Sequence, residues 1–255
     1  MNFIYPIISV IIVSLISIVV AIPLLIKKKL STRLLLFLLS ISVGVLLSTV
    51  FLNFLPEMIE HGYTLMTGIY ILLGFVVMFI LEKFIHFHHH KKCETGDCGH
   101  GHAYNVAPVN LIGDGIHNFI DGLVIAGAYA VNITLGIAAT VSIIFHEVPQ
   151  EIADFGVLLY SGLSKKKALV FNFVSAATAI VGTVLGFFLI EKIHGFTHFI
   201  IPFAAGNFIY IAASNLLPQL HRHCKLKDTI LHLAAIFIGI AIIVLVILYA
   251  PVHAH

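Results

Sequence analysis

The 255-residue sequence is poor in charge, because only 10% of its residues are Asp, Glu, Lys or Arg while 60% are hydrophobic. Its mean hydropathy is +1.07. Soluble globular domains carry about 25% charged and about 45 to 50% apolar residues. A soluble fold is therefore excluded. The formal net charge of +2 gives no sign of a nucleic-acid partner.

Cysteine is scarce as well, with three residues in the chain. Three cysteines argue against a disulfide framework, and Cys93-x4-Cys98 is not a zinc-finger spacing. The segment 87–104 is nevertheless dense in imidazole and thiol groups, the ligands that zinc prefers. We expect a flexible cytosolic loop that captures or senses metal, with a functionless solvated loop as the alternative. Its candidate ligands are His88, His89, His90, Cys93, Cys98, His100 and His102.

Long apolar runs fill most of the remaining sequence, and each is long enough to cross a bilayer as a helix. They predict an all-α integral membrane protein with eight transmembrane helices in a single polytopic domain, residues 1–255. The expected location is the cell membrane, where the lipid bilayer surrounds a multi-pass chain. The eight windows are 3–26, 34–59, 64–86, 106–131, 133–161, 168–190, 197–220 and 229–250.

Basic residues predict the orientation of these helices. Thirteen of the fourteen Lys and Arg residues fall in the connections after windows one, three, five and seven or, for Lys83, at the end of window three, and only Lys192 falls on the other side. Because cytoplasmic loops carry an excess of Lys and Arg, these four loops are expected in the cytoplasm. Both termini are then extracytoplasmic.

Two polar clusters interrupt the windows 106–131 and 133–161, which contain no Lys or Arg. Five carboxylates there would cost on the order of 12 to 18 kcal/mol if left ionised and unpaired in the membrane. Protons or a metal cation must supply positive charge, and we favour a metal held by imidazole and carboxylate groups. The clusters are Asp114, His117, Asn118 and Asp121, and His146, Glu147, Gln150, Glu151 and Asp154.

At helical spacing, each cluster forms one ligand-rich face. Antiparallel neighbours bring Asp121 level with His146, and His117 level with Glu147 and Gln150. Asp114 then lies level with Glu151 and Asp154. Pro149 adds a polar group, because it leaves the Phe145 carbonyl without its helical donor and favours a kink.

A short internal repeat favours a transporter over a passive scaffold. The pattern N-x-L-P-[EQ] occurs in the window 34–59 and again in the window 197–220, on helices predicted to run in opposite directions. Inverted repeats around a midplane site are frequent in secondary transporters. The polar residues of the repeat are expected at the outer and cytoplasmic mouths of a pathway: Asn53 and Glu57, and Asn215 and Gln219.

The motifs H-N-F-x-D-G and H-E-x-P-x-E-x-x-D-F, within eight spans that include a His-rich loop, resemble the ZIP family of divalent-metal transporters and its LIV-1-like branch. The resemblance implies a binuclear metal centre, alternating access and a homodimer. The first site would use His117, Asp121, His146 and Gln150. The second would use Asn118, Asp121, Glu147 and Gln150.

Position 150 departs from the family pattern, because Gln stands where LIV-1-like members usually have His. A neutral amide binds zinc more weakly and suits harder cations better. Asn172 and Ser175 lie near a place where some relatives supply another ligand, although such residues commonly join helices by hydrogen bonds.

The sequence thus predicts a transporter and not an enzyme, which moves Zn²⁺ into the cytoplasm as its substrate. Fe²⁺, Mn²⁺ or Cd²⁺ are alternative substrates. An intramembrane zinc hydrolase is a rival hypothesis, but its H-E-x-x-H motif fails at Gln150 and Pro149 would break the helix. A metal sensor that binds without transport is the third hypothesis, which binding without flux would support.

Overall fold

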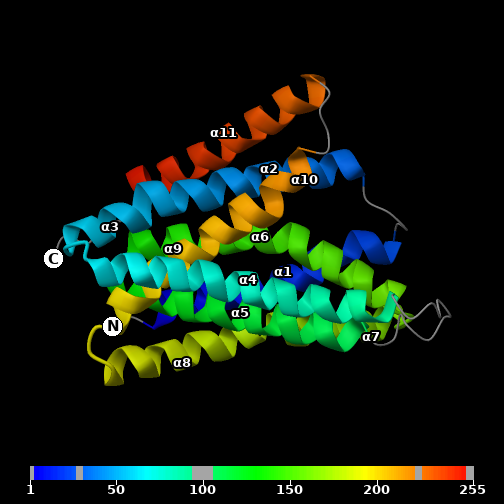
Figure 1. Ribbon diagram of the computed structural model, residues 1–255, viewed down its shortest axis with the longest axis horizontal. Helices are drawn as coiled ribbons and strands as arrows, with labels where there is room; N and C mark the ends of the chain where they lie inside the picture. Colours follow the sequence, from blue (N-terminus) through cyan, green and yellow to red (C-terminus); the bar gives the residue numbers. More distant parts are fainter. Residues whose placement is uncertain (1–2, 27–30, 94–105, 222–225, 251–255) are drawn as a thin grey trace.

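The computed structural model describes residues 3–26, 31–93, 106–221 and 226–250, and every regular element in these ranges is helical (Figure 1). Two short stretches, η1 and η3, are π-helical. In chain order the elements are α1 (Ile4–Ile26), α2 (Thr32–Thr49), η1 (Val50–Phe54), α3 (Leu55–Glu60), α4 (Leu65–Cys93), α5 (Val106–Val131), α6 (Ile133–Tyr160), α7 (Lys165–Ala176), α8 (Thr178–Lys192), α9 (Phe196–Tyr210), η3 (Ile211–Leu216), α10 (Leu217–Leu220) and α11 (Leu226–Tyr249).

Seven helical stretches within these ranges are long and apolar enough to cross a membrane, which confirms an all-α integral membrane protein. α5 is not among the seven although it has 26 residues. The polar cluster near its middle lowers its mean hydropathy, because it replaces four apolar positions of a spanning helix. The count of eight spans and the side of the termini stay predictions.

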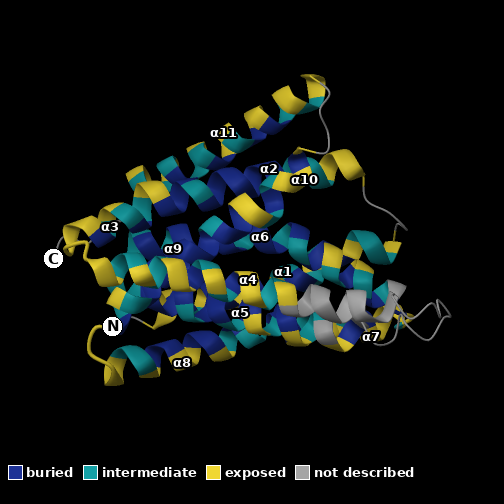
Figure 2. Cartoon of the chain, in the orientation of Figure 1, coloured by how far each residue is buried: buried dark blue, intermediate teal, exposed yellow. Residues whose placement is uncertain are grey.

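The outside of the bundle is apolar. Leu72 on α4 is 65% exposed, and Phe237 and Leu248 on α11 are 66% and 67% exposed. Figure 2 shows exposed residues along α4 and α11, whereas α6 and α9 are largely buried. Large apolar side chains on an outer face are stable against lipid tails and unfavourable in water. The burial pattern is therefore that of a bundle surrounded by lipid.

Both copies of the N-x-L-P-[EQ] repeat adopt the same local structure. The N–H of Leu55 donates to the carbonyl of Val50, and the N–H of Leu217 donates to the carbonyl of Ala212. Each of these five-residue steps lies just before a proline, Pro56 or Pro218. Proline lacks an N–H and its ring crowds the preceding turn, and a π-bulge accommodates that crowding within a continuous helix.

The repeat also extends to helix packing. Gly44 precedes Asn53 by nine residues, and Gly206 precedes Asn215 by nine residues. A Cβ atom at Gly44 would overlap the α11 backbone at Ile236, and one at Gly206 would overlap the α4 backbone at Ile71. α2 therefore packs on α11 as α9 packs on α4. Figure 1 shows α2 and α9 running in opposite directions, as the inverted repeat predicts.

Candidate metal centre

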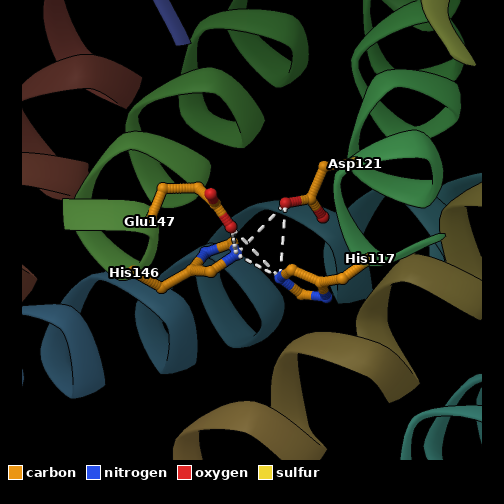
Figure 3. Close-up of side chains that lie close together, drawn as sticks. All are labelled: His117, Asp121, His146 and Glu147. Carbon is orange, nitrogen blue, oxygen red and sulfur yellow. Dashed lines mark hydrogen bonds and ion pairs between the residues drawn. The ribbon is translucent and has the colours of Figure 1, made fainter. Parts of the chain in front are cut away.

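Four side chains from α5 and α6 meet in the middle of the bundle, as Figure 3 shows. Nε2 of His117 lies 3.2 Å from Nε2 of His146 and 3.2 Å from Oε1 of Glu147. Nε2 of His146 lies 3.2 Å from Oδ2 of Asp121 and 3.5 Å from Oε1 of Glu147. All four residues are buried. Two imidazoles and two carboxylates thus converge on one point.

The connection between α5 and α6 fixes the register that brings these groups together. Asn132 caps α6, because its Oδ1 accepts a hydrogen bond of 2.7 Å from the N–H of Leu135. Only this residue separates the two helices. His117 and Glu147 are therefore each fifteen residues from the turn, and they lie level in antiparallel helices.

Two contacts outside the cluster fix the orientation of the His146 ring. Its Nδ1 lies 2.9 Å from the carbonyl oxygen of Ser142, which accepts the ring N–H. The Phe208 ring on α9 packs against the imidazole, with centroids 5.8 Å apart. A histidine that donates through one nitrogen presents the other as an electron pair for a metal. Nε2 of His146 is the atom that faces the cluster.

A second group of acidic side chains adjoins the first. Asp114, Glu147 and Glu151 have carboxylate oxygens within 4.8 Å of one another, and all three residues are buried. The Asn172 amide of α7 donates to Oε2 of Glu151. Glu147 belongs to both groups. The two groups therefore share one carboxylate.

The structure arranges the predicted second site differently from the sequence expectation. Nδ2 of Asn118 donates to Oδ1 of Asp114 at 3.0 Å, and Nε2 of Gln150 donates to the same oxygen at 3.2 Å. Asp114 and Glu151, expected along a pathway, are the residues that join Glu147. Asp154 lies beside Asn110, whose Nδ2 donates to it at 3.0 Å. The helical spacing already placed Asp114 and Glu151 on the ligand-rich faces.

The acidic oxygens lack a compensating positive charge from α5 and α6, which contain no Lys or Arg. Among the described residues, Asp114 Oδ2, Asp121 Oδ1 and Glu151 Oε1 are buried without a hydrogen-bond donor. Buried carboxylate oxygens are normally paired with donors or cations. The donor set of imidazole nitrogen and carboxylate oxygen suits Zn²⁺ and its transition-metal neighbours.

A cavity of about 840 Å³ reaches this cluster, and we name it the metal-centre cavity. Its walls include His117 and His146 in mid-bundle, and Thr32 at the start of α2. Asn215 and Gln219, expected at one mouth of the pathway, also line it. A polar route thus joins the cluster to the bundle end where α2 begins and α10 ends.

The remaining candidates lie elsewhere. Asn53 is partly buried in η1, and Glu57 lines a separate cavity at the opposite end of the bundle. Ser175 donates to the carbonyl of Leu111 at 3.0 Å, the helix-joining role expected of it. Ser42 on α2 donates to the Phe145 carbonyl at 2.5 Å, so the acceptor freed by Pro149 has a partner. The side chains of His88, His89, His90, Cys93, Cys98, His100 and His102 lie outside the described residues.

Known proteins resemble this chain over most of its length. The ZIP zinc transporter profile matches residues 3–110 and 100–247. Zinc transporter ZIP10 of Homo sapiens is 35% identical over 187 residues, which cover 67% of this chain and 22% of the relative. Zinc transporter YKE4 of Saccharomyces cerevisiae is 31% identical over 241 residues, which cover 82% of this chain and 69% of the relative.

The chain spans about a fifth of the length of human ZIP10, and about two thirds of the length of YKE4. ZIP proteins are transporters and not enzymes, so the family sets this chain apart from the intramembrane hydrolases. Its helices make it a multi-pass membrane protein. The profile and the two relatives show that the chain belongs to the ZIP family of zinc transporters, in its LIV-1-like branch.

Proposed function

We propose that this protein carries a divalent metal, Zn²⁺ first of all, across a membrane into the cytoplasm through the buried cluster of α5 and α6. The observation that carries the proposal is the convergence of His117, Asp121, His146 and Glu147, with ligand atoms within 4.8 Å of one another and no Lys or Arg on either helix. Burying these ionised carboxylates costs free energy when no cation is bound, and a bound cation offsets that cost.

The centre would hold two ions. His117, Asp121, His146 and Glu147 supply the first site, and Asp114, Glu147 and Glu151 supply the core of the second. Asn118 and Gln150 become ligands of the second site when their amide groups turn their oxygens inward. A shared carboxylate between two adjacent cations reduces their mutual repulsion, because its negative charge lies between them.

The access route indicates an inward-facing state. The metal-centre cavity opens toward the bundle end whose connections carry thirteen of the fourteen Lys and Arg residues, the end predicted to face the cytoplasm. On the other side, the stacked rings of Phe54 and Phe208 are fully buried, with centroids 5.7 Å apart. A metal in the cluster can leave inward but not outward. Transporters built from inverted repeats can exchange the inward-facing state for an outward-facing one, because the two repeats can swap conformations.

Three further features complete the proposal. α5 forms the eighth span, with its polar face turned toward the metal and away from lipid. The His- and Cys-rich segment 87–104, whose first residues continue α4 as far as Cys93, captures metal released into the cytoplasm. The protein acts in the cell membrane as a homodimer, as the family resemblance predicts.

The direct test is uptake by the purified protein in liposomes, with metal on the outside and a fluorescent chelator inside. We expect saturable Zn²⁺ uptake that Fe²⁺, Mn²⁺ or Cd²⁺ inhibits by competition, and no inhibition by Mg²⁺, because imidazole ligands disfavour the harder ion. Saturable binding of Zn²⁺ to the purified protein without uptake would contradict transport and favour a sensor.

A further inference from the structure

A second cavity, of about 460 Å³, lies at the bundle end opposite the metal-centre cavity. It is bounded by α3, by the turn between α5 and α6, and by the first turns of α9. We name it the α3–α9 cavity. The polar groups that line it include Glu57, His61, Asn132 and His198. Two imidazoles and two carboxylates, those of Glu57 and Glu60, thus line one water-accessible cavity.

Glu57 is held in place by two neighbours. Nδ2 of Asn132 donates to its Oε2 at 3.2 Å, and its Oε1 lies 2.8 Å from Nε2 of His61. The Glu57 side chain is 16% exposed, whereas the His61 side chain is 53% exposed. Because Asn132 also caps α6, the residue that sets the register of the buried cluster orients this carboxylate as well.

The rings of the two histidines lie edge to face beside the cavity. Their ring centroids lie 5.8 Å apart at an interplanar angle of 85°. In the buried cluster, the rings of His117 and His146 lie 5.3 Å apart at 69°. Imidazoles that share a tetrahedral zinc ion bind it at about 2.0 to 2.1 Å through one nitrogen each, which places their rings at comparable separations. The ring separation of the outer pair is therefore close to that of the inner pair. Among the described residues, however, only the two buried groups have three ligand atoms within 4.8 Å of one another, so a shared metal at Glu57, His61 and His198 requires the exposed imidazoles to turn toward the carboxylate.

The backbone fixes both rings without burying them. His61 caps the C-terminal end of α3, where the helix dipole favours a cation. His198 lies in the first turn of α9, and its N–H donates to the Gly195 carbonyl at 3.0 Å. Gly195 has φ of 79°, a left-handed turn that starts α9 beside α3. Neither histidine fills the core, so packing does not explain why two imidazoles meet here.

We propose that Glu57, His61 and His198 form a second, water-exposed binding site for a divalent transition metal, at the mouth opposite the metal-centre cavity. Three protein ligands leave a fourth position for water, which permits fast exchange. Imidazole selects Zn²⁺ and similar ions over Ca²⁺ and Mg²⁺. The site would load metal that later reaches the buried cluster. Its role in loading rests on the proposed transport, whereas the binding itself does not.

The two sites are separated in this conformation. Ile201 on α9 lines the α3–α9 cavity and Ile211 at the start of η3 lines the metal-centre cavity, and the buried Phe208 lies between them in sequence. Its stacking partner Phe54 precedes Met58, which lines the α3–α9 cavity. Binding at Glu57, His61 and His198 can therefore be measured independently of the buried cluster.

The test measures Co²⁺ binding to the full-length protein in detergent by visible absorption, with Zn²⁺ as competitor. The buried cluster is disabled in all samples by Asp121→Ala with His146→Ala. The outer variant adds His61→Ala and His198→Ala, and the matched control adds His194→Ala, an exposed histidine that does not line the α3–α9 cavity. Ligands in the loop 87–104 contribute equally to every sample.

We expect the outer variant to lose one Co²⁺ equivalent, or to bind it at least about tenfold more weakly, and the His194→Ala control to match its parent. Glu57→Gln should weaken binding while both imidazoles remain. Equal stoichiometry and affinity in the outer variant and the control would overturn the site.

Zn²⁺ uptake measurements distinguish a failure of the outer binding site from a failure of the proposed transport function. With the buried cluster intact, His61→Ala with His198→Ala should raise KM for Zn²⁺ about tenfold and leave kcat unchanged, because loading precedes passage through the cluster. If the wild-type protein shows no flux while Co²⁺ binding depends on His61 and His198, the site stands and transport is wrong. A normal KM in the double variant contradicts the loading role.

Discussion

At the residue scale, Gln150 is the position where we expect side-chain chemistry to tune the proposed metal centre. It is partly buried, lines the metal-centre cavity and donates to Asp114 through Nε2 at 3.2 Å. An amide offers a neutral oxygen where an imidazole would offer a stronger zinc ligand. We therefore expect position 150 to set both the affinity of the proposed second site and its preference among metals.

We predict that Gln150→His binds Zn²⁺ more tightly, by about tenfold for each 1.4 kcal/mol of ligand improvement. Flux requires release, so half-saturating zinc should fall while maximal uptake stays equal or decreases. Mn²⁺ and Fe²⁺ should compete less well. Titration calorimetry and competitive uptake measure these changes. The matched control is Gln219→His on α10, which lines the same cavity but donates to Asn215 and not to Asp114. Unchanged affinity and metal ranking in Gln150→His would show that residue 150 does not face the metal.

The residues that meet in the buried cluster were largely predictable, and their hydrogen bonds were not. Helical period and an antiparallel turn suffice to place His117 opposite Glu147 and Asp121 opposite His146. The roles of Asn118 and Gln150 depend on which way each amide is turned, and that choice is set by Asp114 on the same face. Spacing alone also could not show that Asn172 of α7 would hold Glu151.

At the element scale, glycine allows α5 and α8 to approach until their backbones touch. A Cβ at Gly122 would overlap the Ala179 carbonyl, and a Cβ at Gly182 would overlap the Phe119 carbonyl. Thr183 on α8 donates to the Gly122 carbonyl at 3.0 Å. Small residues commonly permit such close contacts between membrane helices. The contact with α8 holds α5 in place at Gly122, the residue next to Asp121.

We predict that Gly182→Ala destabilises the protein by about 1 to 3 kcal/mol, because the added methyl group meets backbone that cannot rotate away. The measurement is the thermal unfolding midpoint in detergent. Gly156→Ala on α6 is the matched control, since nothing lies within 4 Å of a Cβ there. It should be neutral or stabilising by up to about 1 kcal/mol. Equal midpoints for the two variants would contradict the close contact.

Helix positions were predictable from apolar runs, whereas the breaks within helices were not. Each predicted window overlaps a helix of the structure, because a spanning helix needs about 20 apolar residues. The π-bulges before Pro56 and Pro218 were not predicted, because they depend on how the neighbouring turns satisfy their hydrogen bonds. The packing of α2 on α11 and of α9 on α4 was not predicted either, because it depends on contacts between segments that are distant in the sequence.

At the scale of the whole molecule, orientation decides whether transport is uptake or export. The Lys-rich connections and the metal-centre cavity lie at one end of the bundle, and the α3–α9 cavity lies at the other. The positive-inside rule assigns the first end to the cytoplasm. The bundle geometry alone is compatible with either direction, so orientation needs its own measurement.

We predict that a membrane-impermeant thiol reagent applied to intact cells labels Thr64→Cys and leaves Lys166→Cys unlabelled. Both positions are exposed: Thr64 lies in the connection between α3 and α4, and Lys166 lies in the first turn of α7 at the opposite end of the bundle. The background replaces Cys93, Cys98 and Cys224 by Ser. Permeabilised cells provide the control, because both positions should then react. The reverse pattern in intact cells would place the Lys-rich loops outside and make the protein an exporter.

The central claim is that metal crosses the bundle through the buried cluster of α5 and α6. The most direct measurement is Zn²⁺ uptake into liposomes by Asp121→Ala, compared at equal insertion with Glu191→Ala, which removes an exposed carboxylate far from the cluster. Asp121 is fully buried and lies 3.2 Å from His146 and 3.6 Å from His117. We predict that Asp121→Ala abolishes uptake while Glu191→Ala retains it. Uptake by Asp121→Ala near the wild-type rate would contradict the account.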